Sequence, residues 1–147
     1  TTVTVASEFT MTGTTLYIEY NTRYLDEITP MGSTSASKYV SRPLQFVNIS
    51  TGFKLLFTYN QPYNTNIDFY YRTSNSGVEG VIHKELKYTK IDNLGTKSSN
   101  NKGGFFEGNV TATGVDDYDI ISVKIVFNSG DSNKTPRLRD FRIVAVA

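Results

Sequence analysis

The sequence predicts an all-β domain made of two packed antiparallel sheets, a β-sandwich of the jelly-roll or Greek-key type. Composition is the first reason: Val, Ile, Thr, Tyr and Phe supply 60 of the 147 residues, against 5 Ala and 8 Leu. These residues favour strands, whereas the best helix formers are scarce. The second reason is that segments with apolar residues at every second position recur between turn-forming stretches. Seven or eight such strands are typical of a sandwich, and the length fits one domain, residues 1–147.

The first two expected strands lie in the N-terminal third. Leu16, Ile18 and Tyr20 alternate with Tyr17 and Glu19, which predicts a half-buried strand there. A short apolar pair, at positions 44 and 46, follows a proline at position 43. Because proline has no N–H to donate to a ladder, this second strand is expected to begin at that point or to lie at a sheet edge.

The middle of the chain contains the clearest expected hairpin. Aromatic and aliphatic residues alternate with other residues over Phe53–Tyr59 and again over Ile67–Tyr71. The connection Asn60–Thr65 is short and rich in turn formers, so we expect the two strands to pair through it.

The next two segments are less regular. Val78–Ile91 has charged residues at near-helical spacing, but glycines frame its start and no steady apolar stripe follows, so extended structure is expected. Asp92–Gly104 has three Gly, two Ser and three Asn, which is the composition of a linker.

Two strands are expected near the C-terminus. Ile121–Phe127 alternates apolar residues with Ser122 and Lys124. Leu138–Ala147 begins with one apolar face and becomes apolar on both faces towards its end. A strand that is apolar on both faces is typical of a sheet interior, so we expect this last strand to have a neighbour on each side.

Composition and charge exclude several classes of function. The net charge of +1 does not provide the broad basic surface of a nucleic-acid binder. Without cysteine, disulfides and thiolate chemistry are impossible, and a single histidine leaves too few of the usual ligands for catalytic zinc or copper. No apolar stretch approaches the ~18 residues of a membrane span. We therefore expect no cofactor and no membrane insertion, and the start at Thr1 suggests a piece of a longer polypeptide.

Few residues suggest reaction chemistry. His83 is the sole histidine, and no nucleophile motif accompanies it, so a structural role is favoured. Asp116, Asp117 and Asp119 form the densest acidic cluster, and whether they bind Ca²⁺ stays open because the spacing of an EF-hand is missing. No motif singles out a carboxylate pair of the kind that a glycosidase needs. Neither catalytic nor metal-binding residues are therefore assigned.

The aromatic residues give a more specific hypothesis. Tyr63, Tyr70 and Tyr118 occupy outward-facing or loop positions of the expected strands, and Asn64 adjoins the first of them. Exposed tyrosines beside amides and carboxylates can stack on sugar rings, and they can equally form a subunit interface. These four residues are the candidates for ligand or interface contact.

Five runs of the sequence, 42 of the 147 residues, form an ordered set: SKYVSRP at 37–43, STGFKLLF at 50–57, NIDFYYRT at 66–73, SVKIVF at 122–127 and TPRLRDFRIVAVA at 135–147. In this order they resemble structural proteins from the tails and baseplates of contractile-tailed phages of the cyanophage-like myovirus type. The chain departs from that pattern at Thr58–Tyr59 and over Val78–Gly104. No set of catalytic residues comes with this resemblance.

The resemblance implies a non-enzymatic module of the virion, often a terminal domain of a longer protein. Its expected partners are other virion proteins or further copies of itself, through strand edges and tyrosine-bearing loops. The alternative from another class is a carbohydrate-binding module that attaches a virion or a separate enzyme to a surface glycan. An enzyme that cleaves glycans through an unrecognised acid pair is the third and least favoured reading.

Overall fold

The computed structural model describes residues 27–30, 35, 37–92 and 104–146. In that part of the chain, antiparallel strands and one short 3-10 turn are the regular elements. Their bounds are β1 Lys38–Val40, β2 Leu44–Asn60, β3 Thr65–Ser74, η1 His83–Glu85, β4 Thr89–Lys90, β5 Phe106–Ser129 and β6 Arg137–Val146. The expected all-β, antiparallel fold is therefore confirmed.

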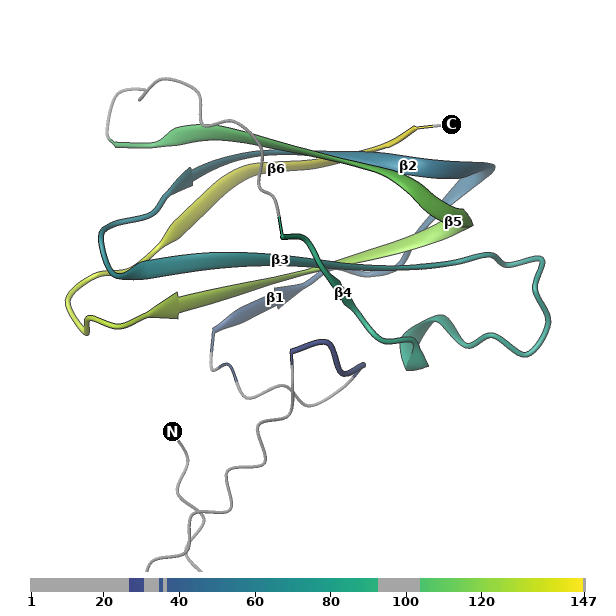
Figure 1. Ribbon diagram of the computed structural model, residues 1–147, viewed down its shortest axis with the longest axis horizontal. Coiled ribbons are helices and arrows are strands. Elements are labelled where there is room, and N and C mark those ends of the chain that lie inside the picture. Colours follow the sequence, from purple (N-terminus) through teal and green to yellow (C-terminus); the bar gives the residue numbers. More distant parts are fainter. Residues whose placement is uncertain (1–26, 31–34, 36, 93–103, 147) are drawn as a thin grey trace, which may run out of the picture.

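All six strands belong to one sheet, in the order β4-β3-β5-β2-β6, with β1 also paired to β5. Figure 1 shows that this sheet is folded over, so that two layers face each other. The β6 layer contains β6 with residues 52–60 of β2 and 106–113 of β5, and the β3 layer contains β3, β4, β1 and residues 120–129 of β5. Two separate sheets, as the sequence analysis expected, are not confirmed, because β5 runs through both layers.

Two opposed bulges allow the sheet to bend. Between the pairs Gln45↔Ile120 and Ser50↔Tyr118, β2 has four residues where β5 has one. Between Ser50↔Tyr118 and Gly52↔Thr113, β5 has four residues where β2 has one. Each bulge kinks its strand and increases the local twist, so one long strand pair can serve both layers.

Tyr118 fixes this bend from inside. Its side chain is fully buried, and its hydroxyl donates a 2.6 Å hydrogen bond to the carbonyl oxygen of Gly52. Only glycine fits at position 52, because a Cβ there would lie 2.7 Å from the backbone oxygen of Ala112. The close backbone approach and the buried hydroxyl therefore depend on each other.

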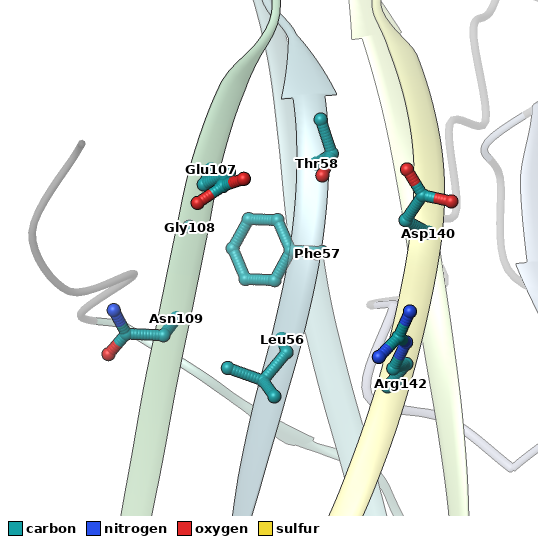
Figure 2. A pocket seen from close by; sticks show the side chains of 8 residues that line it. All are labelled: Leu56, Phe57, Thr58, Glu107, Gly108, Asn109, Asp140 and Arg142. Atoms are coloured by element: carbon teal, nitrogen blue, oxygen red, sulfur yellow. The ribbon is translucent and has the colours of Figure 1, made fainter. Parts of the chain in front are cut away.

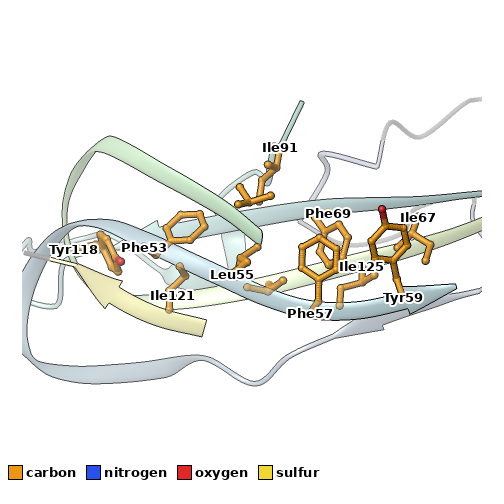
Figure 3. Packing of buried hydrophobic residues seen from close by; sticks show 12 residues of the cluster. Phe53, Leu55, Phe57, Tyr59, Ile67, Phe69, Ile91, Tyr118, Ile121 and Ile125 are labelled. Carbon is orange, nitrogen blue, oxygen red and sulfur yellow. The ribbon is translucent and has the colours of Figure 1, made fainter. Parts of the chain in front are cut away.

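The main core fills the space between the layers (Figure 3). Residues at alternate positions of β2 point into it from one side, and those of β3 and the second half of β5 from the other. The rings of Phe57 and Phe69 meet across it with their centroids 4.5 Å apart. The residues expected to face inward do so: Phe53, Leu55, Phe57, Tyr59, Ile67, Phe69, Ile121, Val123 and Ile125.

The expected hairpin is wrong. β2 and β3 lie in different layers, and each pairs with β5 instead of with the other. The connection Gln61–Asn64 is an arch between layers, held by bonds from the Thr65 backbone N–H and hydroxyl to the Pro62 oxygen (3.2 and 2.7 Å). Large apolar side chains explain this outcome: facing strands bury Phe57 against Phe69, whereas side-by-side pairing would leave both faces half open.

Two further expectations are corrected. Val78–Ile91 is mostly irregular, with η1 inside it and only the two residues of β4 in a strand. β6 is an edge strand, since β2 is its one neighbour in the described sheet, whereas an interior strand was expected. The start of β2 at Leu44, directly after Pro43, agrees with the prediction. The expected strand at Leu16–Tyr20 and most of the Asp92–Gly104 segment lie outside the described residues.

A second, smaller core covers the outer face of the β3 layer. Tyr70, Tyr88 and Val126 pack there with Ile28. The Lys124 ammonium lies in this core, only 4% exposed, with a Glu27 carboxylate oxygen 2.7 Å away, and it donates a 2.6 Å hydrogen bond to the Glu27 backbone oxygen. The segment around η1 and residues 27–30 thereby covers a face that alternation alone predicts to be solvated.

Candidate functional site

A shallow polar groove lies on the outer face of the β6 layer (Figure 2). Its volume is about 380 Å³, and Leu56 and Thr58 of β2 form its floor. Glu107 and Asn109 of β5 stand on one side of that floor and Asp140 and Arg142 of β6 on the other, as the alternation of the three strands requires. These residues are not among the predicted contact residues, although apolar and polar residues alternate over Glu107–Thr113 as in a strand.

The backbone of β6 is unusual at this groove. Asp140 has a φ of 52°, in the left-handed region that non-glycine residues avoid. The β2–β6 register shifts at the same place, since Leu56 pairs with Arg142 but Thr58 pairs with Arg139. This bulge turns the Asp140 side chain out to solvent, where 65% of it is exposed and its carboxylate lies 3.7 Å from Arg139 Nε.

The groove offers polar groups but no acid–base pair. Within the part of the chain that the structure describes, the side chains of Glu107, Asn109 and Arg142 make no hydrogen bond or ion pair. Both carboxylates are open to water, whereas a carboxyl group that acts as a general acid is normally desolvated. No aromatic ring is exposed along the lining, so a sugar would find no stacking surface there.

The four predicted contact residues are not brought together. Tyr63 is 87% exposed on the β2–β3 arch, and Asn64 beside it has a φ of 63° and accepts a 2.9 Å hydrogen bond from the Gly130 N–H. Tyr70 and Tyr118 are 5% and 0% exposed, so neither presents the exposed ring that the sequence predicted. Tyr70 is turned into the second core, and Tyr118 closes the bend, which leaves neither ring a surface to offer a ligand.

The arch and the β5–β6 loop form one tip of the molecule around Tyr63. The Lys134 ammonium lies 5.5 Å from the centre of the Tyr63 ring and also pairs with Asp131 at 3.3 Å. One charged group thus lies over an aromatic ring whose remaining surface is exposed, next to amide and carboxylate side chains.

His83 has two serine partners. Its Nδ1 lies 2.7 Å from the Ser74 hydroxyl and its Nε2 lies 2.7 Å from the Ser122 hydroxyl. Burial, and then the positive charge of Arg72, lower the pKa of His83, so the neutral ring is favoured. A nucleophilic serine needs an accessible hydroxyl and a carboxylate on the other ring nitrogen, but Ser122 is fully buried and the other partner is a second serine. This arrangement ties η1 to β3 and β5.

The acidic cluster is divided between two environments. Asp116 and Asp117 are exposed on the β5 bulge. Asp119 is buried and accepts hydrogen bonds from the Ser76 hydroxyl and from the Ser76 N–H (2.7 Å), which lower its pKa. Among residues 27–30, 35, 37–92 and 104–146, no three His, Cys, Asp or Glu side chains gather in a metal-binding arrangement.

Five of the exposed apolar side chains fall within residues 39–49, which we call the apolar segment. Val47 is 99% exposed and Ile49 is 53% exposed, within the β2 bulge where Phe46–Ile49 has no partner strand among the described residues. Tyr39, Val40 and Leu44 are also between 43% and 51% exposed. Tyr39 lines a second hollow, of about 350 Å³, with Phe127, Leu138 and Phe141, where β1 and β6 come close.

The exposed apolar residues of this segment are close together in the sequence. Scattered single apolar residues are normal on a protein surface, but here five lie within eleven consecutive positions.

Among the described residues, no helix has the length and apolar character needed to cross a membrane. Comparisons with protein-family models, with curated proteins and with solved structures found no match to this chain.

Proposed function

We propose that this domain is a non-enzymatic assembly or attachment module of a phage virion, acting in the tail or baseplate through contact with other proteins. The observation that carries the contact role is the apolar segment, above all the almost complete exposure of Val47. When a partner removes such side chains from water, the free energy falls by roughly 25 cal/mol for each Å² of apolar surface buried. The resemblance of five ordered sequence runs to tail proteins supports the virion location.

The folded-over sheet suits such a role. We propose that it is the bent-sheet form of a two-layer sandwich related to jelly-roll or Greek-key domains, with a rigid core that holds its edges in fixed positions. Fixed edges allow repeated, symmetric contacts with little ordering cost on assembly.

The location is tested on phage particles that encode this sequence. Antibodies against the purified domain are expected to label the tail or baseplate in immuno-electron microscopy, with antibodies against the major capsid protein as the control. If the polypeptide is missing from purified particles by mass spectrometry, the virion role is wrong.

A second candidate function, carbohydrate binding, is favoured by one specific observation. Tyr63 presents an exposed ring at a tip that also carries Asn64, Asp131 and Lys134. A ring of this kind can stack on a pyranose while amides and carboxylates bind hydroxyl groups.

A glycan array followed by titration calorimetry tests this alternative. Binding that Tyr63→Ala abolishes and that Tyr39→Ala, a matched exposed tyrosine outside the tip, leaves unchanged would support it. An array on which no glycan binds the wild-type domain would exclude the alternative and leave protein contact as the function.

A further inference from the structure

The edge position of β6 conflicts with its sequence. Residues 143–146 are apolar on both faces, which is the pattern of a strand with neighbours on both sides, yet the described sheet gives β6 only β2. We propose that this end of β6 pairs with the same strand of a second copy of the chain, antiparallel and around a two-fold axis. The inference rests on the proposed assembly function and names one of its contact surfaces.

The first half of β6 is protected against such pairing. It carries Arg137, Arg139 and Arg142, and the bulge at Asp140 breaks its regular geometry. Charged side chains and bulges are the usual means by which edge strands avoid pairing with other chains. The first half of β6 is therefore not expected to pair with a strand of another chain.

The second half has none of these protections. Ile143, Val144, Ala145 and Val146 form four apolar residues in regular register with Leu55 to Gly52 of β2. Val144 is 49% and Val146 is 41% exposed, on the outer face of the β6 layer. An apolar edge that presents unpaired backbone N–H and C=O groups is a template for another strand.

The alternation of the strand fixes how two copies fit. Directly opposed residues of antiparallel strands lie on the same face of a sheet, so the outward valines must face one another. A two-fold axis at Ala145 satisfies this condition, because it places Val144 opposite Val146 of the second copy and Ala145 opposite itself. The four valines then form one apolar patch, and the two β6 layers become one continuous sheet.

Charge favours a second copy in this orientation. With the axis at Ala145, the two Arg142 side chains lie six residues apart along the strands, twice the three positions that separate Arg142 from Ala145. That is roughly 20 Å, about twice the distance over which physiological salt screens exposed charges. The other arginines lie further apart still, whereas parallel pairing would place each arginine beside its own copy.

The proposed contact is small. With the axis at Ala145, three described residues from each copy, 144–146, are paired, and they bury less than the roughly 1,200 Å² at the lower end of stable interfaces. The isolated domain is therefore expected to associate weakly and in proportion to its concentration. In a symmetric assembly, other contacts raise the effective concentration of the two edges.

Disulfide trapping tests the register. Because the chain has no cysteine, Ala145→Cys introduces a single thiol, and opposed positions of antiparallel strands lie within reach of a disulfide. Under mild oxidation, this variant is expected to form covalent dimer several-fold faster than Thr111→Cys, a more exposed position on β5 of the same layer. Adding Val144→Lys to Ala145→Cys should reduce the rate several-fold, with circular dichroism confirming that each variant is folded.

Equal dimer formation by the Ala145→Cys and Thr111→Cys proteins would overturn the proposal. In that case, a thiol reagent on Val144→Cys identifies the reason, because this side chain is 49% exposed in the described structure. Slow reaction would mean that another part of the same chain covers the edge, and fast reaction would mean that the edge is uncovered. Labelling of phage tails by antibody does not depend on this register. The proposed assembly function is therefore not contradicted if β6 does not pair with a second copy. Both proposals are contradicted only if the phage particles also lack the protein.

Discussion

Single residues decide where this sheet bends. Tyr118 is fully buried, although its position in the acidic run Asp116–Asp119 indicates an exposed turn. Sequence could not reveal this, because the bend depends on the Gly52 carbonyl, a partner 66 positions away. By contrast, the inward positions of Phe53, Phe57 and Phe69 follow from local alternation and were predicted correctly.

We predict that Tyr118→Phe destabilises the domain by about 1–3 kcal/mol, because it leaves the Gly52 carbonyl oxygen buried without its donor. Urea unfolding followed by fluorescence measures the change. Tyr63→Phe, at an exposed position, is the matched control and should leave the midpoint unchanged. An equal effect of both substitutions would show that the Tyr118 hydroxyl has no role in the bend.

A second prediction concerns pH. Burial and Arg72 hold the folded-state pKa of His83 below its ordinary value of 6.5, so the unfolded chain binds more protons as the pH falls past that value. The contribution of His83 to stability is therefore complete above about pH 6.5 and is lost as the pH drops through the lowered pKa. Unfolding midpoints from pH 7.5 to 5 should fall for the wild type and fall less steeply for His83→Gln. Parallel profiles for the two proteins would contradict this role of the histidine.

At the scale of elements, period-two alternation identified strands but not their neighbours. β2 and β3 read as a hairpin because their connection is short, yet an arch between layers has the same length. The buried Ser122 and Lys124 were unexpected for a related reason, since the segment that covers them has no regular pattern of its own. The first half of β5 was overlooked, although Gly108, Val110 and Ala112 alternate with polar residues.

The pairing of β2 with β5 depends on a glycine. A Cβ at position 108 would clash with the Phe57 ring, so Gly108→Ala is expected to cost about 1–3 kcal/mol of stability through overpacking. In a double-mutant cycle, Phe57→Leu should make the alanine less costly, because the smaller side chain leaves room for it. Strictly additive effects in urea unfolding would show that this contact does not limit the pairing.

The second core depends on a buried ion pair. Glu27→Gln leaves the Lys124 ammonium, only 4% exposed, without its counter-charge, and should destabilise the domain by about 3 kcal/mol. Replacing both groups, with Lys124→Met and Glu27→Leu, should cost less than this single change, because no unpaired charge remains buried. Thermal unfolding measures both variants. A double variant that is less stable than Glu27→Gln would contradict the account.

At the scale of the whole molecule, composition and alternation predicted the fold class. They did not predict which apolar side chains would be exposed at the surface. Exposure of Val47 arises from the β2 bulge, which depends on how β2 and β5 align over distant residues. The edge position of β6 likewise depends on strand order, and the last strand by itself reads as an interior strand. The apolar segment and the open half of β6 are the two exposed apolar surfaces that we propose as contact sites for a partner.

Cysteine labelling at position 47 tests the contact role most directly. Val47→Cys in the purified domain should react fast with a maleimide, because this side chain is 99% exposed. In assembled phage particles that carry the same substitution, we predict that the thiol is protected, while Val78→Cys, a matched exposed valine in the loop after β3, reacts in both states. Equal reactivity of Cys at 47 in the free domain and in the particle would contradict the proposal that the apolar segment is the assembly surface.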